Sequence, residues 1–251
     1  MSRSTRIRIF VPFLAAFAAF LVWGLIGLTD FGHYKGPYGY VLNRVALPER
    51  HMTNVVTSAV FDYRGFDTMG EEFILFASVV GVVLLLRAAG REDEEDEDEF
   101  EEATTGSDAI RVIGTLMVGG SILVSLWLIA FGFITPGGGF QGGVALAGGA
   151  AMLFVATGYK SFQTLGNESI LDPIEGIGAG GYVVLGIVGL VSGGAFLENF
   201  LGPGVPGTLW SGGSAAIVNW CAAAEVAAAN LVLISQFLEE YLVPIVRERQ
   251  G

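Results

Sequence analysis

The sequence predicts an all-α membrane protein with about six transmembrane helices. Of its 251 residues, 52% are hydrophobic and only 15% are charged, and the mean hydropathy is +0.60. A soluble domain of this length needs a more polar surface. A bilayer core about 30 Å thick requires roughly 20 apolar residues per helix, and six segments of the chain come close to that length.

The six segments are separated by turns or polar stretches, and each has its own start signal or flanking charges. We expect helices over about residues 7–28, 72–87, 109–134, 143–159, 174–197 and 214–238. The first is too long for a signal peptide and lacks a small-residue cleavage site. Thr68-Met69-Gly70-Glu71 predicts a capping box at the head of the second helix, and Asp172-Pro173-Ile174-Glu175 predicts another at the head of the fifth.

Basic residues near the helix ends predict the orientation in the membrane. With both termini in the cytoplasm, nine of the 13 Lys and Arg side chains lie inside and four lie in one outer loop, as the positive-inside rule requires. Residues 91–106 are expected to form a solvated cytoplasmic linker, because Glu92–Glu102 contains ten carboxylates in eleven residues. Such acidity with only two lysines predicts the plasma membrane of an archaeal halophile.

Composition excludes several classes of function. A net charge of −12 argues against a nucleic-acid partner, and one cysteine with two histidines argues against a metal site. Gly176, Gly178 and Gly181 match a dinucleotide-binding spacing, but they lie in an apolar helix rather than after a strand. Pairs four residues apart, such as Gly176 and Gly180, predict helix packing instead. We therefore expect no cofactor, no catalytic residues and no enzyme activity.

A glycine-rich turn joins the third and fourth predicted helices. Its residues are Pro136, Gly137, Gly138, Gly139, Phe140, Gln141, Gly142 and Gly143. Proline cannot continue a helix, and glycine reaches positive φ without penalty, so a tight hairpin is expected. A plain turn needs one or two glycines, and five indicate close approach of the backbone to another surface.

Ionisable residues within the bilayer are candidates for function because their burial is costly. Glu225 lies in the middle of the last helix, among alanines, where it either borders an ion path or forms a structural hydrogen bond. Asn219 and Asn230 are eleven residues apart, on nearly one face of that helix, and are expected to join helices. Glu72, Glu71 and Asp67 cluster at the outer end of the second helix and are further candidates for the ion path, although the capping box also accounts for Glu71.

Two stretches are similar to a known family. "PGGGFQGG" and "SGGSAAIVNWCAAAEVAAA" (Ser211 to Ala229) resemble the B subunit of Mrp-type multisubunit cation/proton antiporters. "NVVTSAVFDYRGFDTMGEE" (Asn54 to Glu72) resembles the C-terminal end of the antiporter's A subunit, which in membrane-bound hydrogenases is a separate E subunit. The resemblance implies a fusion of a two-helix part at 1–90 and a four-helix part at 107–251 through the linker at 91–106.

The resemblance also implies the function. It predicts a membrane subunit that is accessory to the proton-pumping subunits, with A-, C-, D-, E-, F- and G-like partners, and with Na⁺ and H⁺ as the transported ions. No lysine lies within a predicted helix, so the lysine–glutamate pairs of a pumping subunit are missing. Two alternatives remain: the same module in a hydrogenase-type redox complex, and an assembly scaffold that transports nothing.

Overall fold

A computed structural model describes residues 3–28, 36–90 and 107–250, and the regular elements within these ranges are helices. The chain divides into two compact units, Met1–Val41 and Leu42–Gly251. The first unit contains α1 (Arg3–Ile26) and the start of α2 (Tyr38–Arg50). The predicted acidic linker at 91–106 lies outside the described residues.

The second unit is a bundle of long helices with short helices between them. After α2 come α3 (Val55–Ser58), a π-helix (Ala59–Tyr63), α4 (Gly65–Gly90), α5 (Asp108–Ala130), α6 (Gly139–Thr157), α7 (Tyr159–Gln163), α8 (Glu168–Gly193) and α9 (Ser214–Gln250). Helices α4, α5, α6, α8 and α9 are long and apolar enough to cross a membrane, and α1 contributes a shorter apolar helix, Phe10–Ile26. The predicted all-α membrane fold is therefore confirmed.

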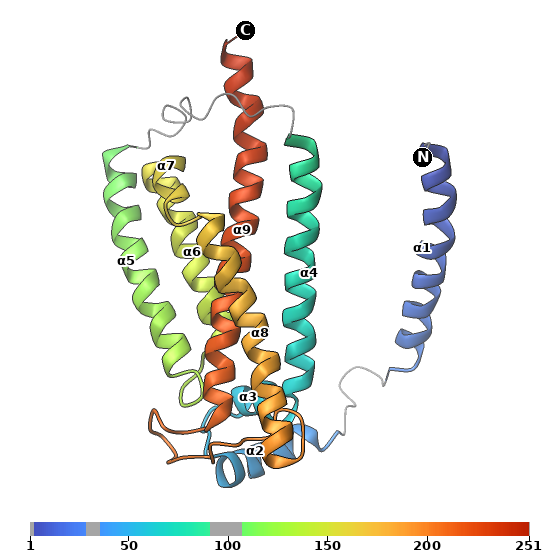
Figure 1. Ribbon diagram of the computed structural model, residues 1–251, viewed down its shortest axis with the longest axis vertical. Helices are drawn as coiled ribbons and strands as arrows, with labels where there is room; N and C mark the ends of the chain where they lie inside the picture. The colour runs from blue at the N-terminus through green and yellow to red at the C-terminus, as the bar shows by residue number, and fades with distance from the viewer. Residues whose placement is uncertain (1–2, 29–35, 91–106, 251) are drawn as a thin grey trace. The chain divides into compact units, whose positions relative to one another are not determined.

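Helix α9 is the centre of the bundle. It packs against α4, α6 and α8. Within its most apolar stretch, 61% is buried, compared with 11% in the corresponding stretches of α4 and α5. Figure 1 shows α9 running along the middle of the second unit, with α5 at its edge. A polar residue on α9 is therefore enclosed by protein, whereas the outer faces of α4 and α5 remain open to lipid or to other subunits.

Glycines on α6 let three helices approach closely. A Cβ atom at Gly139 would lie 2.1 Å from the carbonyl oxygen of Asn219 on α9, and one at Gly143 would lie 2.9 Å from that of Ala223. On the other face, a Cβ atom at Gly142 would lie 2.3 Å from Ile129 on α5. The structure thus gives the glycine-rich turn the close packing that the sequence predicted.

Both predicted capping boxes are wrong. Helix α4 begins at Gly65, directly after the π-helix, and the Thr68 hydroxyl donates to the carbonyl of Val60 instead of capping. Helix α8 begins at Glu168 with Asn167 as its N-cap, so Pro173 lies inside the helix. A proline near a helix start loses few hydrogen bonds, and the earlier cap lengthens the helix by residues 168–172. Glu71, Glu72 and Glu175 consequently lie inside their helices.

Polar contacts fix the segment between α2 and α4 to the turn between α5 and α6. Asn54 donates to the carbonyls of Gly132 at 2.7 Å and Thr135 at 2.9 Å, and the Thr57 hydroxyl donates to Gly132 at 2.6 Å. We call this side of the bundle the hairpin end. Helices α4, α6 and α9 begin there, whereas α5 and α8 begin at the opposite end (Figure 1).

Candidate functional site

Three glutamates are buried in the middle of the bundle. Glu72 on α4 is 1% exposed, Glu225 on α9 is 0% exposed, and Glu175 on α8 is 4% exposed. Among the described residues, no N–H or hydroxyl group donates to either carboxyl oxygen of Glu72 or of Glu225, or to Oε1 of Glu175. The carboxyl groups of Glu72 and Glu225 are close enough to hydrogen-bond to each other. Buried polar atoms are rarely left in this state, so this cluster is the candidate site.

The glutamates interact with one another rather than with a cation. The carboxyl groups of Glu72 and Glu225 interact electrostatically, and Glu175 interacts with Glu225. The spans of α4, α6, α8 and α9 contain no Lys, Arg or His in their sequences. A buried charge at this depth costs on the order of 3 kcal/mol, so a proton, a bound cation or a group on another subunit must compensate each carboxylate.

A glycine contact sets the register between α8 and α9. A Cβ atom at Gly178 would lie 2.6 Å from the backbone nitrogen of Glu225, and one at Gly181 would lie 3.0 Å from the sulfur of Cys221. Gly176 and Gly180, the pair that the sequence favoured for packing, have nothing within 4 Å. The contact therefore lies on the other face of α8, the face that carries Glu175 one turn from Gly178.

Apolar clusters enclose the glutamates on both sides. Toward the hairpin end lies a cluster that contains Phe61, Tyr182, Val218 and Ala222. Toward the opposite end lies a second cluster, which contains Val79, Leu171, Ala228 and Val232. On α4, α8 and α9 alike, the glutamate lies between residues of the two clusters. The carboxyl groups thus occupy a polar layer that apolar side chains separate from both ends of the bundle.

The other acidic candidates on α4 are exposed rather than buried with Glu72. Asp67 lies in the first turn of α4, at the hairpin end, and forms an ion pair with Arg64. Glu71 lies next to Glu72 in the sequence but on an exposed side of the helix. Of the three predicted residues on this helix, the structure brings only Glu72 next to Glu225.

Asn219 joins α9 to both helices of the glycine-rich hairpin. Its Oδ1 accepts from the backbone N–H of Gly139 at 2.6 Å, and its Nδ2 donates to the carbonyl of Ile129 at 2.9 Å. Asn230 instead donates to the carbonyl of Val226 within its own helix. The two asparagines, which the sequence grouped together, therefore make different contacts.

In the hairpin itself, the proline and two side chains are turned outward. Pro136, Phe140 and Gln141 are exposed, whereas Gly138, Gly139, Gly142 and Gly143 are buried. Gly137 and Gly138 have φ values of 154° and 147°, which favour glycine. The buried glycines thus allow the hairpin to pack closely against α5 and α9. The exposed side chains take no part in that packing.

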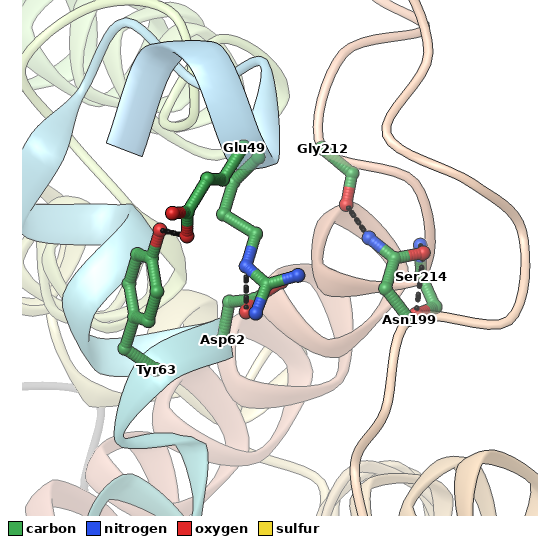
Figure 2. A network of polar contacts seen from close by, with 7 residues as sticks. Glu49, Asp62, Tyr63, Asn199, Gly212 and Ser214 are labelled. Atoms are coloured by element: carbon green, nitrogen blue, oxygen red, sulfur yellow. Dashed lines mark hydrogen bonds and ion pairs between the residues drawn. The ribbon is translucent and has the colours of Figure 1, made fainter. Parts of the chain in front are cut away.

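A polar network covers the hairpin end (Figure 2). Arg50 forms an ion pair with Asp62 at 2.8 Å and stacks over the ring of Tyr63, whose hydroxyl donates to Glu49 at 2.7 Å. Burial raises the pKa of Asp62, and Arg50 partly opposes this. Burial and the Glu49 carboxylate raise the pKa of Tyr63 to about 12. Asn199 extends the polar contacts to the start of α9 by donating to Gly212 and accepting from Ser214.

Sequence reasoning missed two parts of this arrangement. Glu175 fits the predicted capping box Asp172-Pro173-Ile174-Glu175, which accounts for it as a helix cap rather than as part of an ion path. Asn54 has no signal of its own beyond its place in the stretch that resembles the A subunit. A count of the acidic residues within each predicted helix would have found Glu175, but no local pattern indicates the contacts of Asn54 with a turn 78 residues away.

Known proteins resemble this chain over most of its length. Residues 109–232 match the domain related to the MnhB subunit of Na⁺/H⁺ antiporter. The chain is 32% identical over 199 residues to the uncharacterized protein MJ1307 of Methanocaldococcus jannaschii, a match that covers 74% of each chain.

Two solved structures contain chains with a similar fold. One is the membrane-bound sulfane sulfur reductase, an archaeal respiratory membrane complex, with a TM-score of 0.67, 26% identity, and coverage of 93% of this chain and 98% of that one. The other is the Mrp complex from Dietzia sp. DQ12-45-1b, with a TM-score of 0.66 and 22% identity. That match covers 94% of this chain but 26% of the Dietzia chain. With the predicted B-subunit resemblance thus confirmed, the chain belongs to the family of membrane proteins related to the MnhB subunit of Na⁺/H⁺ antiporters.

Proposed function

We propose that this chain is an accessory subunit of a multisubunit Na⁺/H⁺ antiporter complex, in which Glu72 and Glu225 line the sodium path. The observation that carries the proposal is the pair of fully buried carboxyl groups on α4 and α9, which interact with each other and receive no hydrogen bond from another described donor. Because no basic side chain lies within these spans, a proton or a sodium ion is the natural counter-charge. Competition of both ions for one carboxylate pair is a physical basis for exchange.

The pair combines the two parts of the chain that the sequence distinguished. Glu72 belongs to the part at 1–90 and Glu225 to the part at 107–251. The matched chain of the sulfane sulfur reductase is covered to 98%, which supports treating both parts as one functional unit. We propose that the acidic linker at 91–106 joins them on the cytoplasmic side of a halophile's plasma membrane.

The apolar clusters on the two sides of the glutamates, toward the hairpin end and toward the opposite end, argue against a continuous open channel through this chain alone. Access must come from movement or from neighbouring subunits, which the open faces of α4 and α5 can accommodate. We propose A-, C-, D-, E-, F- and G-like subunits as these partners. Asp67 and Glu71 lie at the start of α4, where we propose that they attract cations to the mouth of the path.

The test is neutralisation of each buried glutamate in the intact complex. In membrane vesicles, Glu225→Gln and Glu72→Gln are each expected to lower sodium-dependent proton flux by about tenfold or more, because a proton-carrying group is lost. Complex abundance should stay normal in both glutamine variants, since glutamine keeps the size and hydrogen-bonding capacity of the side chain. Glu240→Gln, a change of an exposed glutamate on the same helix, is the matched control.

Normal flux in both glutamine variants, together with lost assembly in Glu225→Ala, would instead favour a scaffold. A second candidate function is the same role within a redox-driven complex, which the coverage of the sulfane sulfur reductase chain favours. Iron and nickel analysis of the purified complex distinguishes them, since a redox-driven assembly is expected to contain iron, with or without nickel, and a simple antiporter is expected to contain neither.

A further inference from the structure

Glu175 is the buried carboxyl group that the proposed exchange pair does not use. It is 4% exposed, and its Oε1 has no hydrogen-bond partner among the described residues. A structural glutamate at such a position would accept hydrogen bonds from its surroundings. Oε1 of Glu175 therefore contributes no hydrogen bond that would hold α8 in place.

The helix register places Glu175 beside the exchange pair. Helices α8 and α9 run in opposite directions, and Gly178 of α8 meets α9 at Glu225. One turn earlier, the side chain of Glu175 lies on the same face of α8, and its carboxyl interacts electrostatically with that of Glu225. Leu171, a further turn back, packs into the apolar cluster with Ala228.

Asp172 connects Glu175 with the surface. It is exposed, lies three residues before Glu175 on the same side of α8, and interacts electrostatically with it. Leu171 and Val232 belong to the apolar cluster that lies between Glu225 and the opposite end of the bundle, so no polar path runs along α9 through that cluster. In the described bundle, the carboxyl groups of Asp172 and Glu175 thus form a polar path on α8 that passes beside this apolar cluster.

We propose that Glu175 and Asp172 carry protons between the Glu72–Glu225 pair and the end of the bundle where α8 begins. A proton needs only one acceptor oxygen and a water at each step, whereas Glu175 alone offers too few oxygens to coordinate a sodium ion. Each proton that Glu175 passes to the Glu72–Glu225 pair displaces one Na⁺ from the pair. The displaced Na⁺ leaves by a path that does not include Glu175. This inference rests on the proposed exchange role of Glu72 and Glu225.

Other ionisable groups near Glu175 belong to three helices. Glu175 interacts with Asp172 on α8 and with Glu225 on α9. Glu225 interacts in turn with Glu72 on α4 and with Cys221 on its own helix. None of these side chains is cationic. A proton on Glu175 therefore meets no competing positive charge within the described part of the chain.

The test uses the whole complex in membrane vesicles and measures two quantities. The first is sodium-dependent proton flux, normalised to the amount of complex. The second is the rate at which a hydrophobic carbodiimide modifies Glu225, measured by mass spectrometry with and without Na⁺. Carbodiimide attacks protonated carboxyl groups, so sodium bound at the pair should protect Glu225.

Glu175→Gln is expected to lower proton flux about tenfold or more, while Na⁺ protects Glu225 at wild-type concentrations. Glu175→Asp should recover part of the flux, and Asp172→Asn should reduce it by a smaller factor because water can replace an exposed carboxyl. Asp108→Asn, which removes an exposed acid at the start of α5 at the same end, should leave it unchanged.

Full flux in Glu175→Gln, with reduced flux in Glu225→Gln, would overturn the proton route but leave the exchange pair intact. Loss of sodium protection in Glu175→Gln would show that the sodium ion itself binds there, which also overturns it. If Na⁺ does not protect Glu225 even in the wild-type complex, and Glu225→Gln has full flux, the proposed function itself fails. Should Glu175→Gln reduce the amount of complex, Glu175→Asp and Asp172→Asn decide by the same two measurements.

Discussion

The side chain of Asn219 accepts a hydrogen bond from the backbone N–H of Gly139, 80 residues away, and donates to the carbonyl of Ile129. One amide thereby satisfies groups at the start of α6 and at the end of α5. Gly139 makes this contact possible, because any larger residue would meet the backbone of α9. The hairpin and the central helix are thus mutually dependent.

Loss of this contact should weaken assembly. Asn219→Ala leaves a buried N–H without a partner, at a cost of about 1–3 kcal/mol. Gly139→Ala introduces a Cβ atom 2.1 Å from the carbonyl oxygen of Asn219, and overpacking of this kind costs about 1–3 kcal/mol. Both variants should lower the amount and the thermal stability of the purified complex.

Gly176→Ala is the matched control, since a Cβ atom there meets nothing within 4 Å. The close-packing interpretation also predicts that Gly138→Val disrupts assembly rather than sodium affinity. A stable Gly138→Val complex with only its sodium affinity altered would contradict that interpretation.

The two central glutamates should act as one unit. If Glu72 and Glu225 hold a shared ion, neutralising one carboxyl group already abolishes the binding of that ion. Neutralising the second should then lower the flux little further. The double variant Glu72→Gln/Glu225→Gln should therefore have about the same flux as the more impaired single variant. Multiplied losses in the double variant would indicate two independent sites. Glu225→Gln combined with Glu240→Gln serves as the control and should match Glu225→Gln alone.

The orientation predicts the accessibility of introduced cysteines. In a Cys221→Ala background, Lys35→Cys should react with an impermeant thiol reagent in intact cells, and Glu97→Cys in the acidic stretch should not. Both should react after the membrane is opened. Labelling of Glu97→Cys from outside would invert the predicted topology and place the start of α8, with Asp172, on the outer side.

The sequence was sufficient for some of these features because they depend on local physical requirements. Apolar segment lengths predicted the spans, and the glycines of the turn predicted close packing. The start of α4 could not be predicted, because a π-helix ends just before Gly65 and the Thr68 hydroxyl donates a hydrogen bond to the carbonyl of Val60. Glu175 remained hidden because the register of α8 on α9 depends on Gly178, and a four-residue glycine spacing pointed to the wrong face.

The last prediction concerns Arg50 at the hairpin end. Burial raises the pKa of Asp62 above its usual value, and Arg50 is the cation that lowers it. Arg50→Met should therefore raise the pKa of Asp62 further. A carboxyl whose pKa is higher in the folded state stabilises the fold only while protonated, so this contribution is lost as the pH rises through that pKa.

In the Arg50→Met variant, residues 55–63 should thus be less protected from hydrogen exchange at pH 8 than at pH 5, after correction for the intrinsic exchange rates. The wild-type protein should show a smaller difference, because Arg50 compensates the ionised Asp62. Arg44→Met removes an exposed arginine from the same helix and should behave as wild type. Equal protection of Arg50→Met at both pH values would mean that Asp62 does not depend on Arg50, and that other contacts of this segment, such as those of Asn54, Thr57 and Phe61, hold it on the bundle.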